Sequence, residues 1–273
     1  AERVRLAAEE LGTTFVKLGQ FLSMRPDVLP GPFILELRKL QDSVQPLPFD
    51  RMKPVLTAEL GRELSEVFAE FDETPAACAS LAQVYFARLR DGGRAVAVKV
   101  QKPDLRRTVE TDLGLAAWLA GQLHQRIEAL RPFDLPGVVA SARDGLLHEL
   151  DFLHEARNQA FFNTTNPHPE QVFAPEVIPA LSTDRVLVME RIEGEPVGHT
   201  QASADKRREL AAHGARSILH QVLVAGFFHG DPHAGNLLVT RDGRLCLLDW
   251  GLAGHLTRRL RHALADFWAA AAA

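Results

Sequence analysis

Residues 229–236 read His229-Gly230-Asp231-Pro232-His233-Ala234-Gly235-Asn236, and residues 249–251 read Asp249-Trp250-Gly251. Between them lie two short apolar runs separated by Asp242-Gly243, a pattern that predicts a β-hairpin. A lone Asp-x-Gly is ordinarily a turn. Here the two stretches stand in order around a hairpin, and they supply the carboxylate and amide oxygens that Mg²⁺ prefers. The oxygens of Asn236 and Asp249 are therefore candidate ligands for Mg²⁺.

This order resembles the catalytic loop and the Asp-Phe-Gly metal motif of protein kinases. A second feature agrees with it: Val96-Ala97-Val98-Lys99 places a lysine on a strand, as in the kinase lysine that contacts the α- and β-phosphates. Taken alone, Lys99 could equally be an exposed lysine on an edge strand. In the kinase interpretation it needs a carboxylate on a helix, and Glu155 is the best candidate. The predicted catalytic residues are Asp231, Lys99 and Glu155.

Hydrophobic periodicity gives the expected elements. Leu11, Phe15, Leu18 and Leu22 predict one amphipathic helix over 2–24, from which Lys17 and Gln20 point away. Further helices are expected at 33–41, 49–60, 105–130, 137–163 and 205–225, and strands from 67 onward, at 95–100 and at 185–189. The predicted fold is α+β: a protein-kinase-like bilobal fold with an N-terminal helical extension, a helical insertion in the N-lobe and a truncated C-lobe. The corresponding regions are 1–65, 66–195 and 196–273.

Two features depart from ordinary protein kinases. The link between Lys99 and Glu155 is much longer, which predicts the insertion. The expected Gly-rich phosphate loop is replaced by an Ala-rich segment after Pro75. Alanine does not readily adopt the positive φ angles open to glycine, so this segment should be stiffer. The residues expected to contact the nucleotide are Ala76, Ala77, Cys78, Ala79, Ser80, Val84, Lys99, Glu190 and Ile192.

These departures resemble the UbiB (AarF) family of atypical kinases. Its Lys-x-Gly-Gln motif matches Lys17-Leu18-Gly19-Gln20, and its Ala-rich loop matches the segment before Leu81-Ala82-Gln83-Val84. Its Glu-x-Asp motif matches Glu149-Leu150-Asp151, shortly before Glu155. The resemblance runs from about residue 13 to 251. Cys78 interrupts the alanines, and Trp250 replaces the usual Phe.

The resemblance implies ATP or ADP and Mg²⁺ as cofactors, ATP hydrolysis stimulated by lipids, and little phosphorylation of proteins in trans. It implies support of isoprenoid (ubiquinone-type) quinone biosynthesis, with a lipid or membrane surface and quinone-biosynthesis proteins as partners. It also implies that Lys17, with Gln20 on the same helix, pairs with Glu149 or Asp151 as a regulatory lock. Two alternatives stay open. One is a small-molecule phosphotransferase of the aminoglycoside or choline kinase type, and the other is a non-catalytic nucleotide-sensing scaffold that binds lipid.

Composition narrows the partners. The 273 residues carry a formal net charge of −4, so there is no overall basic field to attract nucleic acid. Cys78 and Cys246 show no metal-ligand spacing, which predicts a reducing compartment without structural zinc. The most apolar stretch, 113–123, is shorter than the ~20 residues of a membrane span. We expect a cytoplasmic protein, peripheral to the inner membrane. We also expect this chain to be a piece of a longer protein, so that any membrane anchor would lie outside it.

Overall fold

The computed structural model describes residues 1–40 and 45–272. Its contacts divide the chain into two units. The first comprises Ala1–Leu64, Phe71–Tyr85 and Lys99–Asp151, and the second comprises Ser65–Glu70, Phe86–Val98 and Phe152–Ala273. The sequence predicted three regions, 1–65, 66–195 and 196–273. They divide the chain differently from these two units, and they stay a prediction.

The N-terminal segment forms two helices, α1 (Glu2–Leu11) and α2 (Thr13–Ser23), so the prediction of one helix over 2–24 was wrong. Gly12, at φ 98°, breaks the helix because this conformation is open to glycine but not to a helical residue. The break also turns Leu11 outward, where it is 60% exposed rather than part of the buried stripe. Phe15 and Leu22 do pack inward, against Ala8, Leu37 and Leu40.

Of the next two predicted helices, the first has different bounds in the structure and the second is confirmed. Helix α3 (Gly31–Leu37) ends before the predicted boundary at 41, a position outside the described residues. Helix α4 (Phe49–Leu60) confirms the predicted 49–60, and Gly61 ends it in the left-handed conformation. A single turn, α5 (Leu64–Val67), follows.

A sheet of five strands follows, comprising β1 (Phe68–Phe71), β2 (Ala77–Cys78), β3 (Ala82–Leu89), β4 (Ala95–Gln101) and β6 (Val186–Glu190). Its order is β1-β3-β4-β6, with β2 paired to β3. The predicted strand at 95–100 is confirmed as β4. The Ala-rich segment was expected to be a loop, but Ala77 and Cys78 pair antiparallel with Val84 and Gln83. The strand covers only these two residues of the segment, and Ala76, Ala79 and Ser80 lie outside it, as expected of a loop.

The insertion is helical, as predicted, but its helices are divided differently: α6 (Leu105–Arg126), a 3₁₀ segment η1 (Glu128–Phe133), α7 (Leu135–Glu149) and α8 (Phe152–Thr165). The predicted continuous helix over 137–163 breaks at Leu150 and Asp151. The Leu150 carbonyl accepts a bond from buried Gln101 Nε2 at 3.0 Å, and the Phe152 N–H donates to the Asp184 carbonyl at 2.9 Å. Two backbone groups therefore leave the helical ladder for partners far along the chain.

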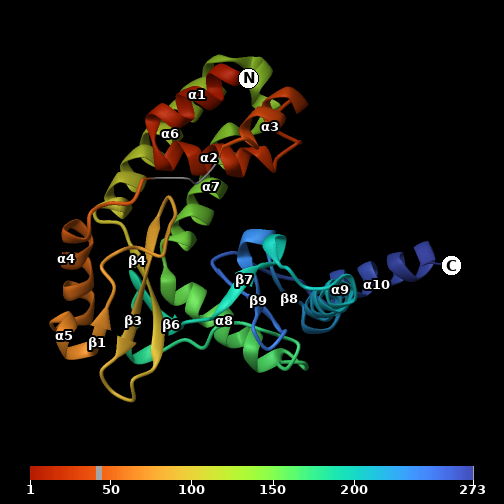
Figure 1. The fold of residues 1–273 in the computed structure, drawn as a ribbon. Coiled ribbons are helices and arrows are strands. Elements are labelled where there is room, and N and C mark those ends of the chain that lie inside the picture. The colour runs from red at the N-terminus through yellow and green to blue at the C-terminus, as the bar shows by residue number, and fades with distance from the viewer. Residues whose placement is uncertain (41–44, 273) are drawn as a thin grey trace. The chain divides into compact units, whose positions relative to one another are not determined.

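Within the first unit, α2 packs against α1, α3, α6 and α7, and Figure 1 shows these helices side by side. Buried Thr14 on α2 donates to Asp112 Oδ2 on α6 at 2.6 Å. A second core joins Leu81, the residue before β3, to the helices of the insertion through Val109, Leu113 and Leu146, among others.

The second unit contains a four-stranded sheet of order β5-β10-β9-β7 and the pair β11-β8. These strands are β5 (Val172–Phe173), β7 (Gly194–Pro196), β8 (Phe227–His229), β9 (Leu237–Thr240), β10 (Leu245–Leu247) and β11 (Ala253–His255). The predicted hairpin is confirmed as β9 and β10, with Leu245 opposite Val239 and Gly243 at φ 80° in the turn. Short 3₁₀ segments lie at η2 (Pro179–Leu181), η3 (Val197–His199) and η5 (Ala234–Asn236).

The predicted α-helix over 205–225 is α only over α9 (Ala204–Leu219) and becomes π-helical over η4 (His220–Ala225). In this wider turn Gln221 is buried, donating to Ser217 Oγ and accepting the His229 N–H. A π-helical turn of this kind often marks a functional segment. Helix α10 (Arg258–Ala272) follows the last strand.

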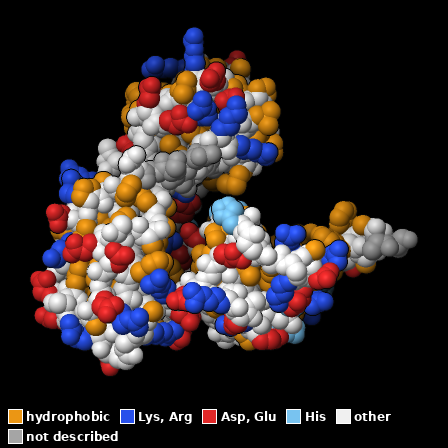
Figure 2. Space-filling view, viewed as in Figure 1, with side chains coloured by type: hydrophobic (Ala, Val, Ile, Leu, Met, Phe, Trp, Pro, Cys, Tyr) orange, Lys and Arg blue, Asp and Glu red, His pale blue; other side chains and the backbone are white. Residues whose placement is uncertain are grey.

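Surface properties agree with the composition. Figure 2 shows Lys and Arg interspersed with Asp and Glu over the visible face. Among the described residues, no helix combines the length and the apolar character needed to span a membrane.

Candidate functional site

The segment between β8 and β9 is fixed by backbone hydrogen bonds to its own histidines. His229 is 3% exposed; its Nδ1 accepts the Asp231 N–H at 3.1 Å and its Nε2 lies 2.9 Å from the Leu248 carbonyl. Since Nδ1 is an acceptor, these bonds assign the proton to Nε2. His229 therefore ties Asp231 to the strand that precedes Asp249, a structural role.

The side chain of Asp231 is exposed, and its Oδ2 lies 3.6 Å from His233 Nε2. The other ring nitrogen of His233 accepts the Gly235 N–H at 3.0 Å. The Asp231 carbonyl accepts bonds from the His233 N–H and from Asn236 Nδ2, at 2.9 and 3.2 Å. An exposed carboxylate on a loop held this firmly suits a group that receives a proton.

Asn236 and Asp249 are brought to the same end of the β9–β10 hairpin. The Leu248 N–H donates to the Asn236 carbonyl at 2.8 Å, so these two segments are directly bonded. The amide nitrogen of Asn236 is used by the Asp231 carbonyl, while its Oδ1 makes no hydrogen bond within the described residues. The amide is thus oriented with its oxygen available to a cation.

Asp249 has φ 48°, a left-handed conformation that few residues other than glycine adopt. Its Oδ1 accepts the Gly251 N–H at 3.2 Å. A Cβ at residue 251 would lie 3.1 Å from Asp249 Oδ1, a tight contact, and 3.9 Å from Glu155 Oε2, an ordinary van der Waals distance. Asp249 Oδ1 and Glu155 Oε2 thus both lie within 4 Å of the Cβ position at Gly251. At Gly230 the neighbour is different: a Cβ would lie 2.7 Å from Leu252 Cγ, so glycine permits the close approach of Leu252.

Trp250 anchors this loop in the core of the second unit and is fully buried. Its ring stacks on Phe162 at 4.5 Å and on Phe227 at 5.8 Å between centroids, and its Nε1 donates to the Leu247 carbonyl at 3.1 Å. The larger residue in place of the family's usual Phe is therefore accommodated by a matching aromatic pocket.

We expect Trp250→Ala to lower the free energy of unfolding by about 3–5 kcal/mol, the cost of a large buried ring and its cavity. Trp250→Phe should cost about 1–2 kcal/mol, because it keeps most of the packing and leaves the Leu247 carbonyl unpaired. Urea unfolding measures both. Trp118→Ala, at a residue 62% exposed on α6, is the control and should change little. An equal loss in Trp250→Ala and Trp118→Ala would contradict the anchor role.

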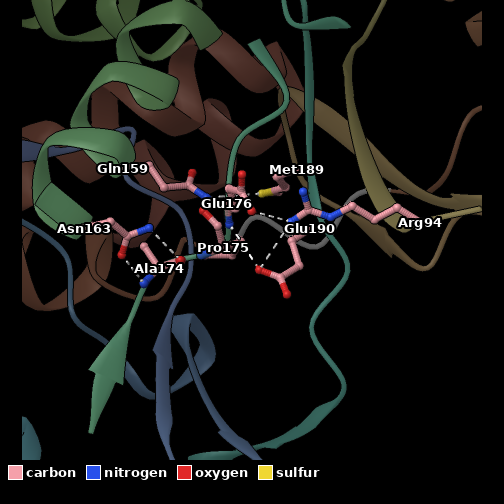
Figure 3. A network of polar contacts seen from close by, with 8 residues as sticks. All are labelled: Arg94, Gln159, Asn163, Ala174, Pro175, Glu176, Met189 and Glu190. Carbon is pink, nitrogen blue, oxygen red and sulfur yellow. Dashed lines mark hydrogen bonds and ion pairs between the residues drawn. The ribbon is translucent and has the colours of Figure 1, made fainter. Parts of the chain in front are cut away.

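Helix α8 carries Glu155, which is 3% exposed. The next turns of this helix hold the chain after β5 and the end of β6 (Figure 3). Gln159 Nε2 donates to the Pro175 carbonyl at 2.6 Å and contacts Met189 Sδ, and Asn163 exchanges two bonds with the Ala174 backbone. The helix that bears the predicted catalytic glutamate thus contacts the end of β6, where the connector, residues 190–196, begins.

Connector residues expected to contact the nucleotide have other partners. The Glu190 N–H donates to the Glu176 carbonyl at 2.8 Å, and its carboxylate lies 3.8 Å from Arg94 (Figure 3). Ile192 is half-buried and lines a hollow of about 740 Å³ with Val239 and neighbouring connector residues. The nucleotide contacts of Glu190 and Ile192 stay predictions.

In the first unit, contacts account for three residues of the motif Lys17-Leu18-Gly19-Gln20. Lys17 Nζ lies 3.3 Å from Glu149 Oε2, at the last residue of α7. Gly19 has no room for a side chain, since a Cβ would lie 3.3 Å from Leu37 and closer still to Leu40. Gln20 Nε2 donates to the Leu40 carbonyl at 3.3 Å. Of the two carboxylates implied by the resemblance, the structure shows the ion pair with Glu149. Asp151, in the break before α8, is half-buried.

The Ala-rich segment is a tight hairpin. The Ala76 N–H donates to the Val84 carbonyl at 2.8 Å, and the Ala79 N–H donates to the Ala82 carbonyl at 2.9 Å. Ser80 closes the turn and is 2% exposed, while Ala76, Ala77 and Ala79 are exposed and Cys78 and Val84 half-buried. Two of its backbone donors are therefore occupied, so any phosphate contact would need other donors.

Lys99 is half-buried on β4. It falls in the first unit and Glu155 in the second, so their pairing stays a prediction.

Two buried polar side chains lie near the Ala-rich segment and Trp250, and neither was assigned a role from the sequence. Gln83 accepts the Leu47 N–H and donates to the Leu47 carbonyl and to Tyr85 Oη, and burial raises the pKa of Tyr85 to about 12. Asn158, 6% exposed on α8, donates to the Trp250 carbonyl at 2.9 Å. For Asn158 the available signal was its place inside a predicted helix, where asparagine is unfavourable unless its side chain has a hydrogen-bond partner.

The donor set fits Mg²⁺ better than a metal held by protein alone. Among the described residues, no group of three or more His, Cys, Asp or Glu side chains could hold a metal ion. Mg²⁺ usually takes one or two protein oxygens and completes its octahedral shell with phosphates and water. Asp249 and the oriented oxygen of Asn236 match that pattern.

Residues 39–273 match the family model described as the ABC1 atypical kinase-like domain. A protein named "Probable protein kinase UbiB" from Xanthomonas campestris pv. campestris (strain B100) is 38% identical over 97% of this chain and 50% of its own length. An aarF domain-containing protein kinase described as chloroplastic and uncharacterized, from Arabidopsis thaliana, is 36% identical over 96% of this chain and 37% of its own length. The chain spans about half the length, or less, of the curated relatives it matches.

Among solved structures, a complex described as Rv3197–erythromycin from Mycobacterium tuberculosis is similar, with a TM-score of 0.66 and 31% identity. The similarity covers 87% of this chain and 60% of that chain. The α+β, kinase-like fold predicted from the sequence is confirmed by these matches.

Proposed function

This chain belongs to the ABC1 atypical kinase-like family, and we propose that it binds ATP with Mg²⁺ and cleaves the γ-phosphate, with little phosphorylation of proteins in trans. The observation that carries the proposal is the arrangement of Asn236 and Asp249. Their segments are bonded to each other, and the Asn236 amide is fixed with its oxygen available to a cation.

The residues of the second unit would divide the work as follows. Asp249 and Asn236 would hold Mg²⁺, which when bound supplies positive charge to the phosphate oxygens. Asp231 would receive the proton of the attacking water or hydroxyl. His229 would keep the Asp231 loop against the strand before Asp249, as its two bonds indicate. Contacts of the nucleotide with Lys99 and the Ala-rich segment are part of the same proposal.

We further propose that this activity supports isoprenoid quinone biosynthesis and is stimulated by a lipid or membrane surface, in the cytoplasm near the inner membrane. Support comes from the UbiB names of the Xanthomonas relatives. Since the chain spans half of those relatives, the substrate, partners and location of the whole protein are proposals.

A second candidate is phosphorylation of a small molecule. It is favoured by the similarity to the Mycobacterium tuberculosis protein whose structure is described as a complex with erythromycin. Incubation with Mg²⁺-ATP and erythromycin, followed by mass spectrometry, would reveal a phosphorylated macrolide. Unmodified erythromycin, with phosphate release that depends on lipid, would favour the first proposal.

The deciding experiment measures Mg²⁺-dependent ATP binding and phosphate release by the purified chain, with and without anionic liposomes. Binding with lipid-stimulated release supports the proposed ATPase. Binding without turnover under either condition would replace it by a nucleotide-sensing scaffold, and absence of binding would overturn it.

We expect Lys17→Ala to leave Mg²⁺-ATP binding intact while changing turnover or nucleotide preference, because it releases α2 from the end of α7. Its effect on stability should stay below about 1 kcal/mol, since the Glu149 partner is 35% exposed. Lys39→Ala removes another lysine of this unit, paired with Glu36 at 2.5 Å, and is the matched control. Identical turnover and nucleotide preference in the wild type and both variants would contradict the lock.

A further inference from the structure

The peptide unit that joins Trp250 to Gly251 is bonded at both of its ends. Its N–H, on Gly251, donates to Asp249 Oδ1 at 3.2 Å. Its carbonyl, on Trp250, accepts from Asn158 Nδ2 at 2.9 Å. A single rigid plane therefore stands between the Asn158 amide and the Asp249 carboxylate.

Asp249 needs such support because its backbone is in a region that an L-residue seldom adopts. The φ of 48° is kept where surrounding structure fixes it, and such outliers gather at functional sites. The Asn158 bond is buried and joins residues far apart in the sequence, so it constrains the loop from outside. Asn158 also lies one helical turn after Glu155, whose Oε2 is within 3.9 Å of the Cβ position at Gly251.

We propose that Asn158 is a positioning residue: through the Trp250–Gly251 peptide it fixes the direction of the Asp249 carboxylate, and so the geometry of the magnesium site. The role at the metal rests on the proposed function. The clamp, by which we mean the Asn158 bond to the Trp250–Gly251 peptide, does not depend on it. Residues that orient a metal ligand from behind typically change metal affinity by about 10–100-fold when mutated.

The matched control is Asn163, on the same helix. It is half-buried and also bonds the backbone, donating to the Ala174 carbonyl at 2.8 Å and accepting the Ala174 N–H at 2.9 Å (Figure 3). Asn163→Ala therefore removes side-chain–backbone bonds from α8 without touching the Asp249 segment. Asn158→Leu keeps the branched shape of the Asn158 side chain and removes its N–H donor without adding a charge, which separates the lost bond from a cavity.

The first readout needs no ligand: hydrogen exchange of the Gly251 amide in the whole chain. We expect Asn158→Ala and Asn158→Leu to speed this exchange by about tenfold or more, the effect of losing one buried hydrogen bond, while Asn163→Ala leaves it unchanged. The second readout is the Mg²⁺ concentration that half-saturates ATP binding. It should rise by about tenfold or more in the Asn158 variants and stay near the wild-type value in Asn163→Ala.

The possible outcomes distinguish failure of the clamp from failure of the proposed function. Unchanged Gly251 exchange in the Asn158 variants, or the same increase in Asn163→Ala, would overturn the clamp. Faster exchange with unchanged Mg²⁺ dependence would overturn its role at the metal. If the wild-type chain binds no Mg²⁺-ATP, the proposed function fails, and Gly251 exchange still shows separately whether Asn158 holds the peptide.

Discussion

Asp249→Asn is expected to abolish Mg²⁺-dependent ATP binding, with a loss larger than the roughly 10–100-fold typical of changes behind a metal ligand. The substitution should leave the loop intact, because asparagine tolerates left-handed φ about as well as aspartate and keeps an oxygen for the Gly251 N–H. What it removes is the negative charge, which a hard dication such as Mg²⁺ requires. Isothermal titration with ATP, at several Mg²⁺ concentrations, measures the loss.

The control is Asp242→Asn, in the turn of the β9–β10 hairpin, where the carboxylate bonds Thr240 and pairs with Arg244 at 2.6 Å. It removes the same charge nearby, from a turn that we do not assign to the metal. Equal binding loss in both variants would point to net charge rather than to a metal ligand. Full binding by Asp249→Asn would remove Asp249 from the site.

Sequence reasoning succeeded where a local signal fixes the conformation. Asp242-Gly243 between two apolar runs gave the β9–β10 hairpin, and Gly61 gave the end of α4. Gly12 carried a similar signal, but the regular spacing of Leu11 and Phe15 concealed it. A positive φ at glycine outweighed that periodicity.

It failed where distant partners decide. The break between α7 and α8 contains neither glycine nor proline, and it depends on Gln101 and Asp184 binding backbone groups of Leu150 and Phe152. The strand at Ala77 and Cys78 was missed for a different reason: its pairing with Val84 and Gln83 is local, but the alanine-rich composition does not reveal it.

The candidate site shows the same contrast. Asp231, Asn236 and Asp249 could be found because their chemistry requires particular residue types at a particular spacing. Asn158 could not, because its role depends on where the Trp250 carbonyl lies after folding. Residues that orient a site from behind are specified by tertiary structure and leave a weak trace in one sequence.

Asp231→Asn should separate binding from turnover. Asp231 is attached to the loop through its backbone, whose N–H and carbonyl bind His229, His233 and Asn236, whereas its exposed carboxylate is 3.6 Å from His233. The amide keeps the volume but accepts a proton poorly. We expect phosphate release to fall by about 10²–10⁴-fold, the usual contribution of a general base, while the affinity for Mg²⁺-ATP changes less than about threefold.

Single-turnover phosphate release and ATP titration, on the same preparation, check this prediction. Asp205→Asn is the control, since it removes an exposed carboxylate paired with Arg208 and should leave both quantities unchanged. A parallel loss of affinity and turnover in Asp231→Asn would mean that Asp231 acts on the metal site and not on the proton. Undiminished turnover would leave the reaction without the base proposed here. In that case release must depend on charge stabilisation by Asp249 and Asn236, because phosphoryl transfer through a loose transition state needs little proton removal before the bond to the leaving group breaks.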